Sequence, residues 1–352
     1  MTRRPVLVAP DKFKGTLSAP EAAAAIGRGL AAAGTERVEV LPIADGGEGT
    51  MEALVHARGG RILTAEVADP LGRPVRAAFG LLEDGATAVI EMAQASGLWR
   101  VDPGELDPAA ATTRGTGELL LAALEAGARE LIVTAGGSAT TDGGRGALEA
   151  LGARFSGRGA DLRALRKRLR GVRLSVACDV RNPLCGTTGA ARAFGPQKGA
   201  SATQVDELAE RLEQWAALAR RTSRRDPADE PMAGAAGGLA GGLWAFAGAR
   251  LASGAALVLD VAGFDARMRR SHAVVTGEGR LDQQTLRGKA LFEIATRCRQ
   301  GGVPCYAVVG IDSLGPFDKR LINIEVEAAA RDSWLAQPGQ LEQAARRIAR
   351  RL

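Results

Sequence analysis

Short apolar runs alternate with amphipathic segments at both ends of the chain. The predicted strands, which are apolar and rich in β-branched residues, are residues 6–10, 38–43, 273–276, 306–309 and 322–326. The predicted helices, with apolar positions three or four residues apart, are residues 21–33, 50–57, 289–300 and 340–352. Strands that alternate with helices in this way predict an α/β fold with a parallel, doubly wound sheet of the Rossmann/flavodoxin-like type.

The central part of the chain has a different pattern. Two alternating runs within residues 61–79 flank Asp69-Pro70-Leu71-Gly72, which is typical of a β-hairpin. The other elements predicted here are strands at 88–91, 131–134 and 174–178, helices at 116–124 and 234–251, and a polar surface loop at 220–231. We therefore expect a second α/β domain with a mixed sheet, residues 63–265, inserted into a first domain formed by residues 1–62 and 266–352. An active-site cleft is expected between them.

Composition narrows the class of protein. The 352 residues are 46% hydrophobic and 24% charged, and no apolar run reaches the roughly 18 residues of a membrane-spanning helix. The N-terminus lacks a signal-peptide pattern, so we expect a cytoplasmic protein. The net charge of +6 comes largely from arginines on predicted helix faces, and only 4% of residues are aromatic, which disfavours nucleic-acid binding. The four cysteines lack zinc-site spacing and are expected to be reduced.

Charged side chains and glycines follow several predicted strands of the first domain. They occur in Asp11-Lys12-Phe13-Lys14-Gly15, in Asp45-Gly46-Gly47-Glu48-Gly49 and in the segment 277–282. The carboxyl ends of parallel strands share one edge of a sheet, so these segments are expected to converge. Lysine is scarce, with six among 46 basic residues, and four lysines (12, 14, 198 and 289) lie in glycine-containing loops. This pattern favours a site that handles phosphate and Mg²⁺.

Three glycine-containing segments of the central part are candidates for phosphate contact. Gly136-Gly137-Ser138 can form a backbone nest for an anion, with Thr140, Thr141 and Asp142 nearby as oxygen donors or ligands. Residues 194–199 form a weaker candidate that includes Lys198. The glycines of residues 234–242 suit either a nucleotide contact or a tightly packed helix. The sequence leaves that choice open.

Several common enzyme classes are disfavoured by absent motifs. The chain has no Gly-x-x-x-x-Gly-Lys-Ser/Thr segment and no Gly-x-Gly-x-x-Gly after the first strand, which argues against P-loop proteins and dinucleotide dehydrogenases. It has no Gly-x-Ser-x-Gly elbow, and its two histidines, His56 and His272, lie in poor contexts for a catalytic triad.

Six motifs together carry a resemblance to a known family. In chain order they are Ala9–Gly15, Ala44–Gly49, Gly136–Thr140, Cys178-Asp179-Val180-Arg181-Asn182-Pro183-Leu184, Phe194–Gly199 and Thr276–Arg280. Nearly the whole chain resembles the bacterial glycerate kinases of type I. The resemblance implies ATP-dependent phosphorylation of D-glycerate, most often to 2-phosphoglycerate, by a Rossmann-like domain that carries a second α/β domain.

The resemblance and the chemistry of phosphoryl transfer suggest roles for the motif residues. The catalytic candidates are Asp45 or Asp179 as base, with Lys12, Lys14 and Arg280 neutralising charge. The candidates for phosphate or nucleotide binding are Gly136, Gly137, Ser138, Thr140, Lys198 and Lys289. The substrate-binding candidates are Asp11, Glu48 and Asn182, and the candidates for Mg²⁺ are Asp142, Glu278 and Asp282.

Two alternatives stay open at this stage. One is a phosphotransferase acting on another small hydroxy acid or sugar acid, and the other is a sensor that binds nucleotide and hydroxy acid without turnover. Neither the phosphorylated hydroxyl, the 2- or the 3-position, nor the assembly follows from the sequence, which allows a homodimer.

Overall fold

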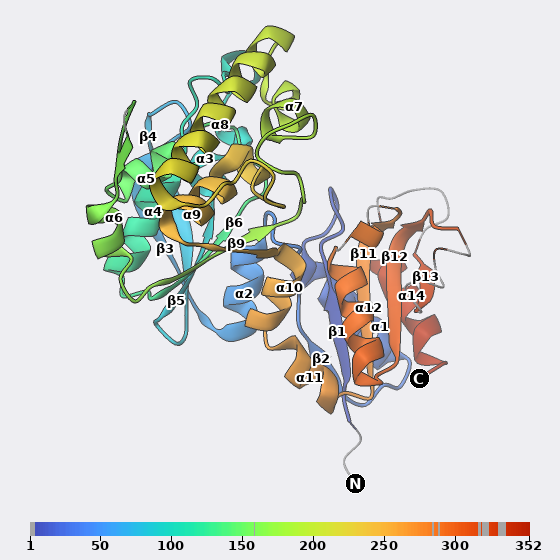
Figure 1. The fold of residues 1–352 in the computed structure, drawn as a ribbon. Helices are drawn as coiled ribbons and strands as arrows, with labels where there is room; N and C mark the ends of the chain where they lie inside the picture. The colour runs from blue at the N-terminus through green and yellow to red at the C-terminus, as the bar shows by residue number, and fades with distance from the viewer. Residues whose placement is uncertain are drawn as a thin grey trace. The chain divides into compact units, whose positions relative to one another are not determined.

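The computed structural model describes residues 4–157, 159–283, 285–287, 289–315, 318, 324–329 and 336–352. The chain forms two compact units (Figure 1). The first unit is Met1–Asp45 with Ala255–Leu352, and the second unit is Gly46–Gly254. The second unit is therefore inserted into the first, as the sequence predicts.

The first unit is built on a parallel sheet in the order β13-β12-β11-β1-β2. Its strands are β1 (Val6–Pro10), β2 (Val38–Val40), β11 (Ala273–Leu281), β12 (Cys305–Asp312) and β13 (Glu325–Ala328). Its helices are α1 (Ala19–Ala32), α10 (Gly254–Val261, at the boundary between the units), α11 (Phe264–Arg270), the short η5 (Thr285–Arg287), α12 (Ala290–Gly301) and α14 (Pro338–Ala349). The alternation of strands and helices confirms the doubly wound α/β class.

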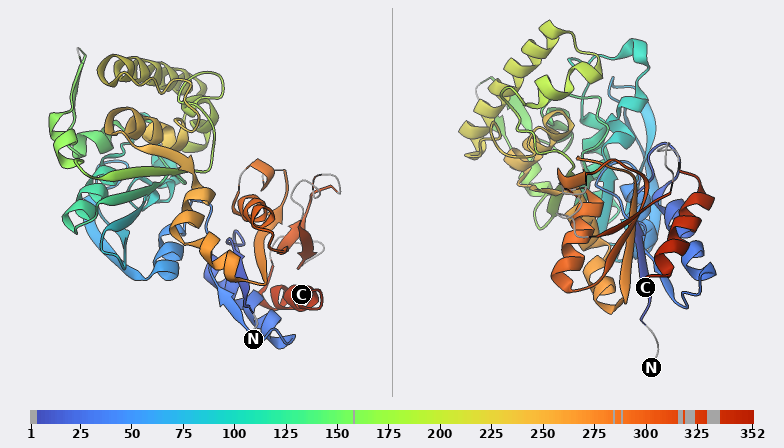
Figure 2. Two further views of the ribbon diagram at one scale, coloured as in Figure 1. Left: turned by 60° about the horizontal axis from the view of Figure 1, so that its bottom comes forward. Right: turned by 90° about the vertical axis from the view of Figure 1, so that its right-hand side faces the viewer.

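Helices cover both faces of this sheet because its strands are apolar on both sides. Along β12, Val308 packs with the cluster under α1 and α14, whereas its neighbours Ala307 and Val309 pack with the cluster under α12. Side chains of successive strand residues point to opposite faces, which explains the division. Figure 2 shows α1 and α14 on one side of the sheet and α12 on the other.

The second unit contains a mixed sheet in the order β10-β9-β6-β5-β4-β3, parallel from β10 to β5 and antiparallel from β5 to β3. Its strands are β3 (Gly60–Ala68), β4 (Pro74–Leu82), β5 (Thr87–Glu91), β6 (Glu130–Thr134), β9 (Arg173–Cys178) and β10 (Arg250–Ser253). A separate hairpin joins β7 (Arg154–Ser156) and β8 (Gly159–Asp161). The predicted hairpin around Asp69–Gly72 is confirmed as the β3–β4 pair.

Helices of the second unit pack on this sheet, and all of them except α2 contribute to one large apolar cluster. They are α2 (Thr50–Arg58), α3 (Ala93–Ser96), α4 (Arg114–Glu125), α5 (Arg145–Ala150), α6 (Arg163–Arg168), α7 (Ala190–Phe194), α8 (Ala202–Ser223) and α9 (Leu239–Ala247). Short 3-10 turns complete the unit: η1 (Leu98–Arg100), η2 (Pro103–Glu105), η3 (Pro196–Lys198) and η4 (Ala235–Gly238). The long α8 lies at the surface of the unit (Figure 2).

The two units divide at residues 45/46 and 254/255, whereas the sequence placed the joints near 62 and 266. Helix α2 packs on β4 and β5 of the second unit, where a side chain on Gly80 would meet Met51 and Val55. Helix α10 is tied to the first unit, because the guanidinium of Arg297 in α12 bonds the Ala256 carbonyl and the Asp260 carboxylate. The unit to which each of these helices belongs is decided by contacts with elements far along the chain, and the local sequence pattern does not contain that information.

Two predicted strands of the first unit are longer than expected. Strand β11 runs on through Leu281 and β12 through Asp312, so the segment 277–281 is part of the sheet and not a loop after it. The pairing of Glu278 with Val309 and of Arg280 with Ile311 explains the extension, because each strand supplies the other's backbone partners. Strand β2 is shorter than predicted, and of the predicted strand 322–326 residues 322 and 323 lie outside the described residues.

Two predictions for the second unit were wrong in part. Helix α8 continues to Ser223, so the predicted loop 220–231 begins later than expected. The predicted helix 234–251 is divided into η4, α9 and β10. Its interruption is local, since Ala236, Gly237 and Gly238 have φ of 52°, 63° and 89°, in the left-handed region that a helix cannot include.

The glycines of residues 234–242 serve close packing against the loop that follows β6. A Cβ atom on Gly242 would lie 2.1 Å from the Gly143 carbonyl oxygen, and one on Gly237 would lie 1.9 Å from that of Thr140. Both clashes are with backbone, which cannot turn aside. Of the two interpretations that the sequence left open for this segment, the structure supports tight packing.

Replacing Gly242 by alanine is therefore expected to lower the free energy of unfolding by about 3 kcal/mol, because backbone must shift to admit the methyl group. Urea denaturation followed by circular dichroism would measure the loss. The matched control is Gly104→Ala, where a Cβ would meet nothing within 4 Å. Equal stability of the two variants would contradict the packing role.

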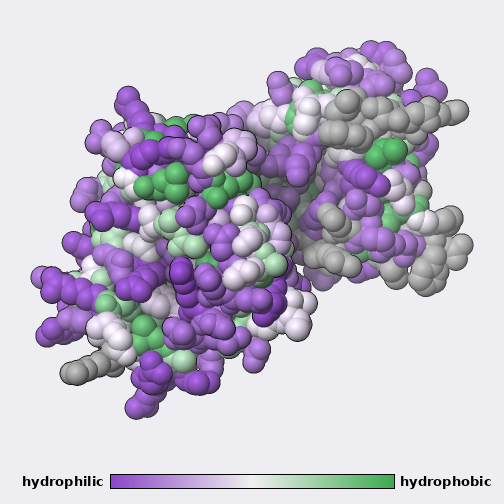
Figure 3. Space-filling model, turned by 90° about the horizontal axis from the view of Figure 1, so that it is seen from above, coloured by the Kyte–Doolittle hydropathy of each residue, from purple (hydrophilic) through white to green (hydrophobic). Residues whose placement is uncertain are grey.

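The surface and the thiols agree with the composition. Hydrophilic side chains cover most of the visible face of each unit, and apolar ones form small scattered patches (Figure 3). Over the part of the chain that is described, no helix combines the length and apolar character needed to cross a membrane. Cys178, Cys185, Cys298 and Cys305 are free, as expected.

Candidate functional site

In the first unit, the segment after β1 lies beside the end of β11. The backbone N–H of Asp11 donates to the Gly277 carbonyl, and a Cβ on Gly279 would lie 3.3 Å from the backbone nitrogen of Lys14. Glycine at 279 thus lets the two segments approach each other closely. Lys14 is exposed and Lys12 is half-buried, so the structure brings the predicted lysines to the same strand ends as Glu278.

Buried carboxylates gather at these strand ends. Asp11 and Glu278 are 7% and 6% exposed. Burial raises the pKa of Asp11 well above its ordinary value, and the nearby charges of Asp45 and Glu278 raise it further. Burial likewise raises the pKa of Glu278 to about 7, although Thr285 donates a 2.7 Å hydrogen bond to its Oε1. The sequence prediction that these acidic residues converge holds for Asp11, Asp45 and Glu278.

The remaining predicted residues of the first unit surround this group. The charge of Asp282 also acts on Glu278, and the exposed Arg280 side chain lies 3.5 Å from the Asp282 carboxylate. Lys289 occupies the position before the first turn of α12, and its charge partly offsets that of Glu278. Two residues between them in the motif, Gln284 and Gly288, lie outside the described residues. The first unit thus offers carboxylates, an arginine and lysines within one region.

The donor set at these strand ends fits Mg²⁺ bound partly through water. Within the described ranges, no group of three His, Cys, Asp or Glu side chains is arranged to hold a metal ion without other ligands. Mg²⁺ usually takes one or two carboxylates and keeps several waters. A cation would stabilise the buried Glu278 carboxylate, whose pKa is raised by burial and further by the nearby charge of Asp282.

In the second unit, the loop after β6 presents unused backbone donors. Two backbone hydrogen bonds join this loop to the end of α3 and the residues after it. The Leu98 N–H donates to the Gly137 carbonyl, and the Ala139 N–H donates to the Ser96 carbonyl. The N–H groups of Gly136, Gly137 and Ser138 have no acceptor among the described residues. Gly137 adopts φ of 71°, in the left-handed region. Successive free N–H groups around a left-handed glycine are a feature of anion-binding nests, so the nest that the sequence predicts for this loop stays a prediction with these groups available.

The segment Asp45–Gly49 includes Gly47, which lies beside the loop 136–138. A Cβ on Gly136 would lie 3.1 Å from the Cα of Gly47, so the two loops are in close backbone contact. Glu48 of the same loop is exposed. The loop leads into α2, whose Met51 N–H donates 2.9 Å to the buried carboxylate of Glu91. The structure thus places Glu48 next to the candidate phosphate loop within the second unit.

Glu91 is a positioning residue that the sequence analysis missed. It is 3% exposed, and burial raises its pKa, while bonds from the Met51 and Gly49 backbone lower it. A buried acid at the last position of the predicted strand 88–91 was the available signal, because buried carboxylates are rare without a partner. Here it anchors the start of α2 and the loop before it.

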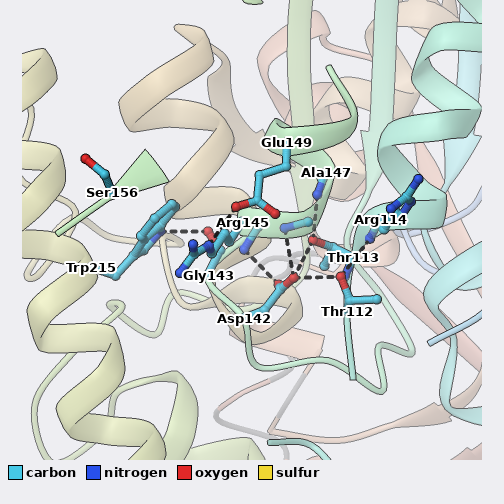
Figure 4. A network of polar contacts seen from close by, with 12 residues as sticks. Thr112, Thr113, Arg114, Asp142, Gly143, Arg145, Ala147, Glu149, Ser156 and Trp215 are labelled. Atoms are coloured by element: carbon cyan, nitrogen blue, oxygen red, sulfur yellow. Dashed lines mark hydrogen bonds and ion pairs between the residues drawn. The ribbon is translucent and has the colours of Figure 1, made fainter. Parts of the chain in front are cut away.

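Asp142 has a structural environment that disfavours the predicted role in binding metal. Its carboxylate accepts four hydrogen bonds: two from the N–H and hydroxyl of Thr113, and one each from the N–H groups of Gly144 and Gly146 (Figure 4). These donors satisfy both oxygens. The carboxylate therefore fixes the turn into α5 and holds the start of α4, as an N-terminal cap does.

Lys198 lies beneath the candidate phosphate loop and is 2% exposed. Its Nζ donates 2.8 Å to the Ser138 hydroxyl and 2.6 Å to the Thr140 carbonyl. The sequence grouped Lys198 with the phosphate-binding residues, and the structure joins it to that loop. Because Lys198 is buried, its ammonium group would influence a bound phosphate through Ser138 and would not contact the phosphate directly.

Asp179 and Asn182 follow β9, next to β6 in the sheet. Asp179 is exposed, whereas Asn182 is half-buried and donates 2.7 Å to the Thr188 carbonyl. The adjacent Cys178 is buried, and burial raises the pKa of its thiol to about 12, which makes it unreactive. Asp179 as a base stays a prediction.

The fold and these loops define a class of protein. A doubly wound α/β unit with carboxylates and lysines at its strand ends, combined with a glycine-containing loop whose N–H groups have no acceptor among the described residues, is typical of enzymes that handle phosphate. The chain belongs to the glycerate kinase family, which residues 6–352 match.

Relatives and a solved structure support this assignment. The chain is 46% identical to the glycerate kinase of Bacillus subtilis (strain 168), over 87% of this chain and 84% of that protein. It is 42% identical to the glycerate 2-kinase of Escherichia coli (strain K12), with the same coverage. A crystal structure from Salmonella typhimurium LT2, provisionally described as glycerate kinase 2, has a TM-score of 0.88 and 37% identity, and the match covers 99% of this chain and 98% of that one.

Proposed function

We propose that this protein transfers the γ-phosphate of ATP to a hydroxyl of D-glycerate and yields 2-phosphoglycerate. The observation that carries the proposal is the row of N–H groups at Gly136, Gly137 and Ser138 that find no acceptor among the described residues, in a member of the glycerate kinase family. Such a nest suits a nucleotide phosphate. The name of the Escherichia coli relative supports the 2-position.

The charged residues of the first unit suit the glycerate side of this reaction. Lys12 and Lys14 supply positive charge for the glycerate carboxylate or the transferred phosphoryl group, and Arg280 can clamp either one through two parallel hydrogen bonds. Asp45 is the proposed base, because it lies among the carboxylates at the strand ends. Asp179 is the alternative base. The expectation that a cleft between the domains holds the reactants stays a prediction.

Mg²⁺ is the proposed cofactor. When bound, it would neutralise charge on the nucleotide phosphates. Glu278 and Asp282 are the residues proposed to hold it, directly or through water. Asp142 is left out of this set because its oxygens already accept four hydrogen bonds from the protein.

Product analysis by phosphorus NMR tests the proposal. Purified protein with ATP, Mg²⁺ and D-glycerate is expected to form a phosphate ester whose phosphorus couples to one carbon-bound proton, which identifies 2-phosphoglycerate. Coupling to two protons would identify the 3-isomer. Parallel reactions with L-glycerate and with lactate serve as controls.

Two other results would redirect the assignment. Faster turnover of another hydroxy acid or sugar acid would make the protein a different phosphotransferase. Binding of ATP and D-glycerate without ADP release would instead indicate a sensor.

A further inference from the structure

Lys198 is buried in the second unit, and no carboxylate of the described residues bonds its ammonium group. Its Nζ contacts the Ser138 hydroxyl and the Thr140 carbonyl, both of which are uncharged. Two further hydroxyls of the same loop, those of Thr140 and Thr141, are buried with no hydrogen-bond partner among the described residues. A buried cation with only neutral partners is costly, so a function that needs its charge is the expected reason for keeping it.

The contacts determine which way the hydrogen bond to Ser138 points. An ammonium group has three donors and no acceptor, so Nζ must donate to the Ser138 oxygen. The proton of that hydroxyl is then free to point away from Lys198. The adjacent N–H groups of Gly136, Gly137 and Ser138 have no acceptor in the described part of the chain, so the hydroxyl becomes a further donor beside them.

We propose that Lys198 is a positioning residue whose ammonium group holds the Ser138 hydroxyl as a hydrogen-bond donor to a phosphate bound at Gly136–Ser138. Lys198 does not touch the phosphate itself. Its positive charge also favours an anion at the loop through the low-dielectric interior. The inference rests on the proposed function, since it concerns the same phosphate loop.

Deprotonation of Lys198 would reverse this arrangement. A neutral amine has a lone pair, which can accept the Ser138 proton while an N–H still bonds the Thr140 carbonyl. Burial lowers the pKa of Lys198 to about 7, and the charge of Asp142, on the loop packed against it, opposes that shift. Phosphate affinity should therefore fall as the pH rises through neutrality, and anion binding near pH 7 should be accompanied by proton uptake.

Calorimetric titration with ADP tests the proposal, with Ser138→Ala as the first variant. At pH 6 the substitution is expected to weaken ADP binding about tenfold or more, the worth of a hydrogen bond to a charged group. At pH 8.5 the same substitution should have a much smaller effect, because the lysine is neutral and the hydroxyl no longer points to the phosphate. Titration in two buffers of different ionisation enthalpy should show proton uptake at pH 7.

Lys198→Met completes a double-mutant cycle. In that background Ser138→Ala should cost little more affinity, and proton uptake should be lost. The matched control is Lys167→Met, at an exposed lysine of α6, which should bind ADP as the unmodified protein does. If Lys198→Met fails to fold, the proposal is tested by the pH dependence of the Ser138→Ala effect in the otherwise unmodified chain.

Two outcomes would overturn the proposal. An effect of Ser138→Ala that is equal at pH 6 and 8.5 would show that the hydroxyl is not controlled by Lys198. If the intact protein binds neither ADP nor inorganic phosphate, the proposed phosphate-binding role of Gly136–Ser138 is wrong. Glycerate phosphorylation is measured separately by NMR, so turnover with a pH-independent Ser138→Ala effect would retain the proposed function and reject this inference.

Discussion

Asp45→Asn is expected to lower kcat by about 10²–10⁴-fold, the usual contribution of a general base. Asparagine has nearly the same shape as aspartate but cannot accept the proton of the glycerate hydroxyl. Asp45 lies near Asp11 and Glu278, whose pKa values its charge raises, so its carboxylate belongs to the electrostatic group at the strand ends. A coupled assay of ADP release with D-glycerate measures the effect.

Three variants interpret that result. Asp179→Asn tests the alternative base, and a larger loss there than in Asp45→Asn would assign the base to Asp179. Lys14→Ala should also lower turnover by orders of magnitude, about the loss seen when a charge-stabilising group is removed. Asp102→Asn, at an exposed position whose side chain does not cap its short helix, is the matched control. Near-normal turnover in both Asp45→Asn and Lys14→Ala would exclude the proposed site.

Glu278→Gln should change how stability depends on pH in metal-free buffer. The pKa of Glu278 is raised from 4.5 to about 7 by burial, so between these values the folded protein binds more protons than the unfolded chain. The contribution of Glu278 to stability is therefore fully present below pH 4.5 and is lost as the pH rises through 7. The loss is on the order of 3 kcal/mol for a shift of this size. Glutamine has no charge and removes this dependence.

Urea denaturation at pH 5 and pH 8 measures the difference. The glutamine variant should be similar to the unmodified protein at pH 5 and more stable than it at pH 8. Glu125→Gln, at an exposed position in α4, is the control and should leave the pH dependence unchanged. Added Mg²⁺ should restore part of the stability at pH 8 only when Glu278 is present. An unchanged pH dependence in Glu278→Gln would contradict the buried-carboxylate interpretation.

Local signals in the sequence predicted many elements well. The helix predicted at 21–33 is an example, since it forms as Ala19–Ala32 and begins at a reciprocal cap between Ser18 and Glu21, three residues apart. The turn Asp69–Gly72 is another, because the Asp69 carboxylate accepts bonds from the backbone of Leu71 and Arg73 as turn chemistry requires. In both cases the partners are a few residues apart, so a short window contains the whole interaction.

Elements that depend on distant partners were predicted less well. Strand β11 extends through the motif 277–281 because β12 pairs with it, and glycines and charges within that motif favour a loop when it is viewed alone. Helix α2 belongs to the second unit because of contacts with β4 and with Glu91, which lies 40 positions away. Sequence periodicity does not identify such partners.

The sequence by itself determined the fold class, the order of the elements and the family, because these are carried by periodicity and by motifs whose spacing is local. It also predicted an anion nest at the loop 136–138, which the binding experiments test. Only the tertiary structure decided what several charged residues do. The Asp142 carboxylate accepts a hydrogen bond from Thr113 at the start of α4, and the Glu91 carboxylate holds the start of α2. Lys198 is buried and bonds the Ser138 hydroxyl. Burial and hydrogen-bond direction depend on neighbours far along the chain, and so the fold decides them.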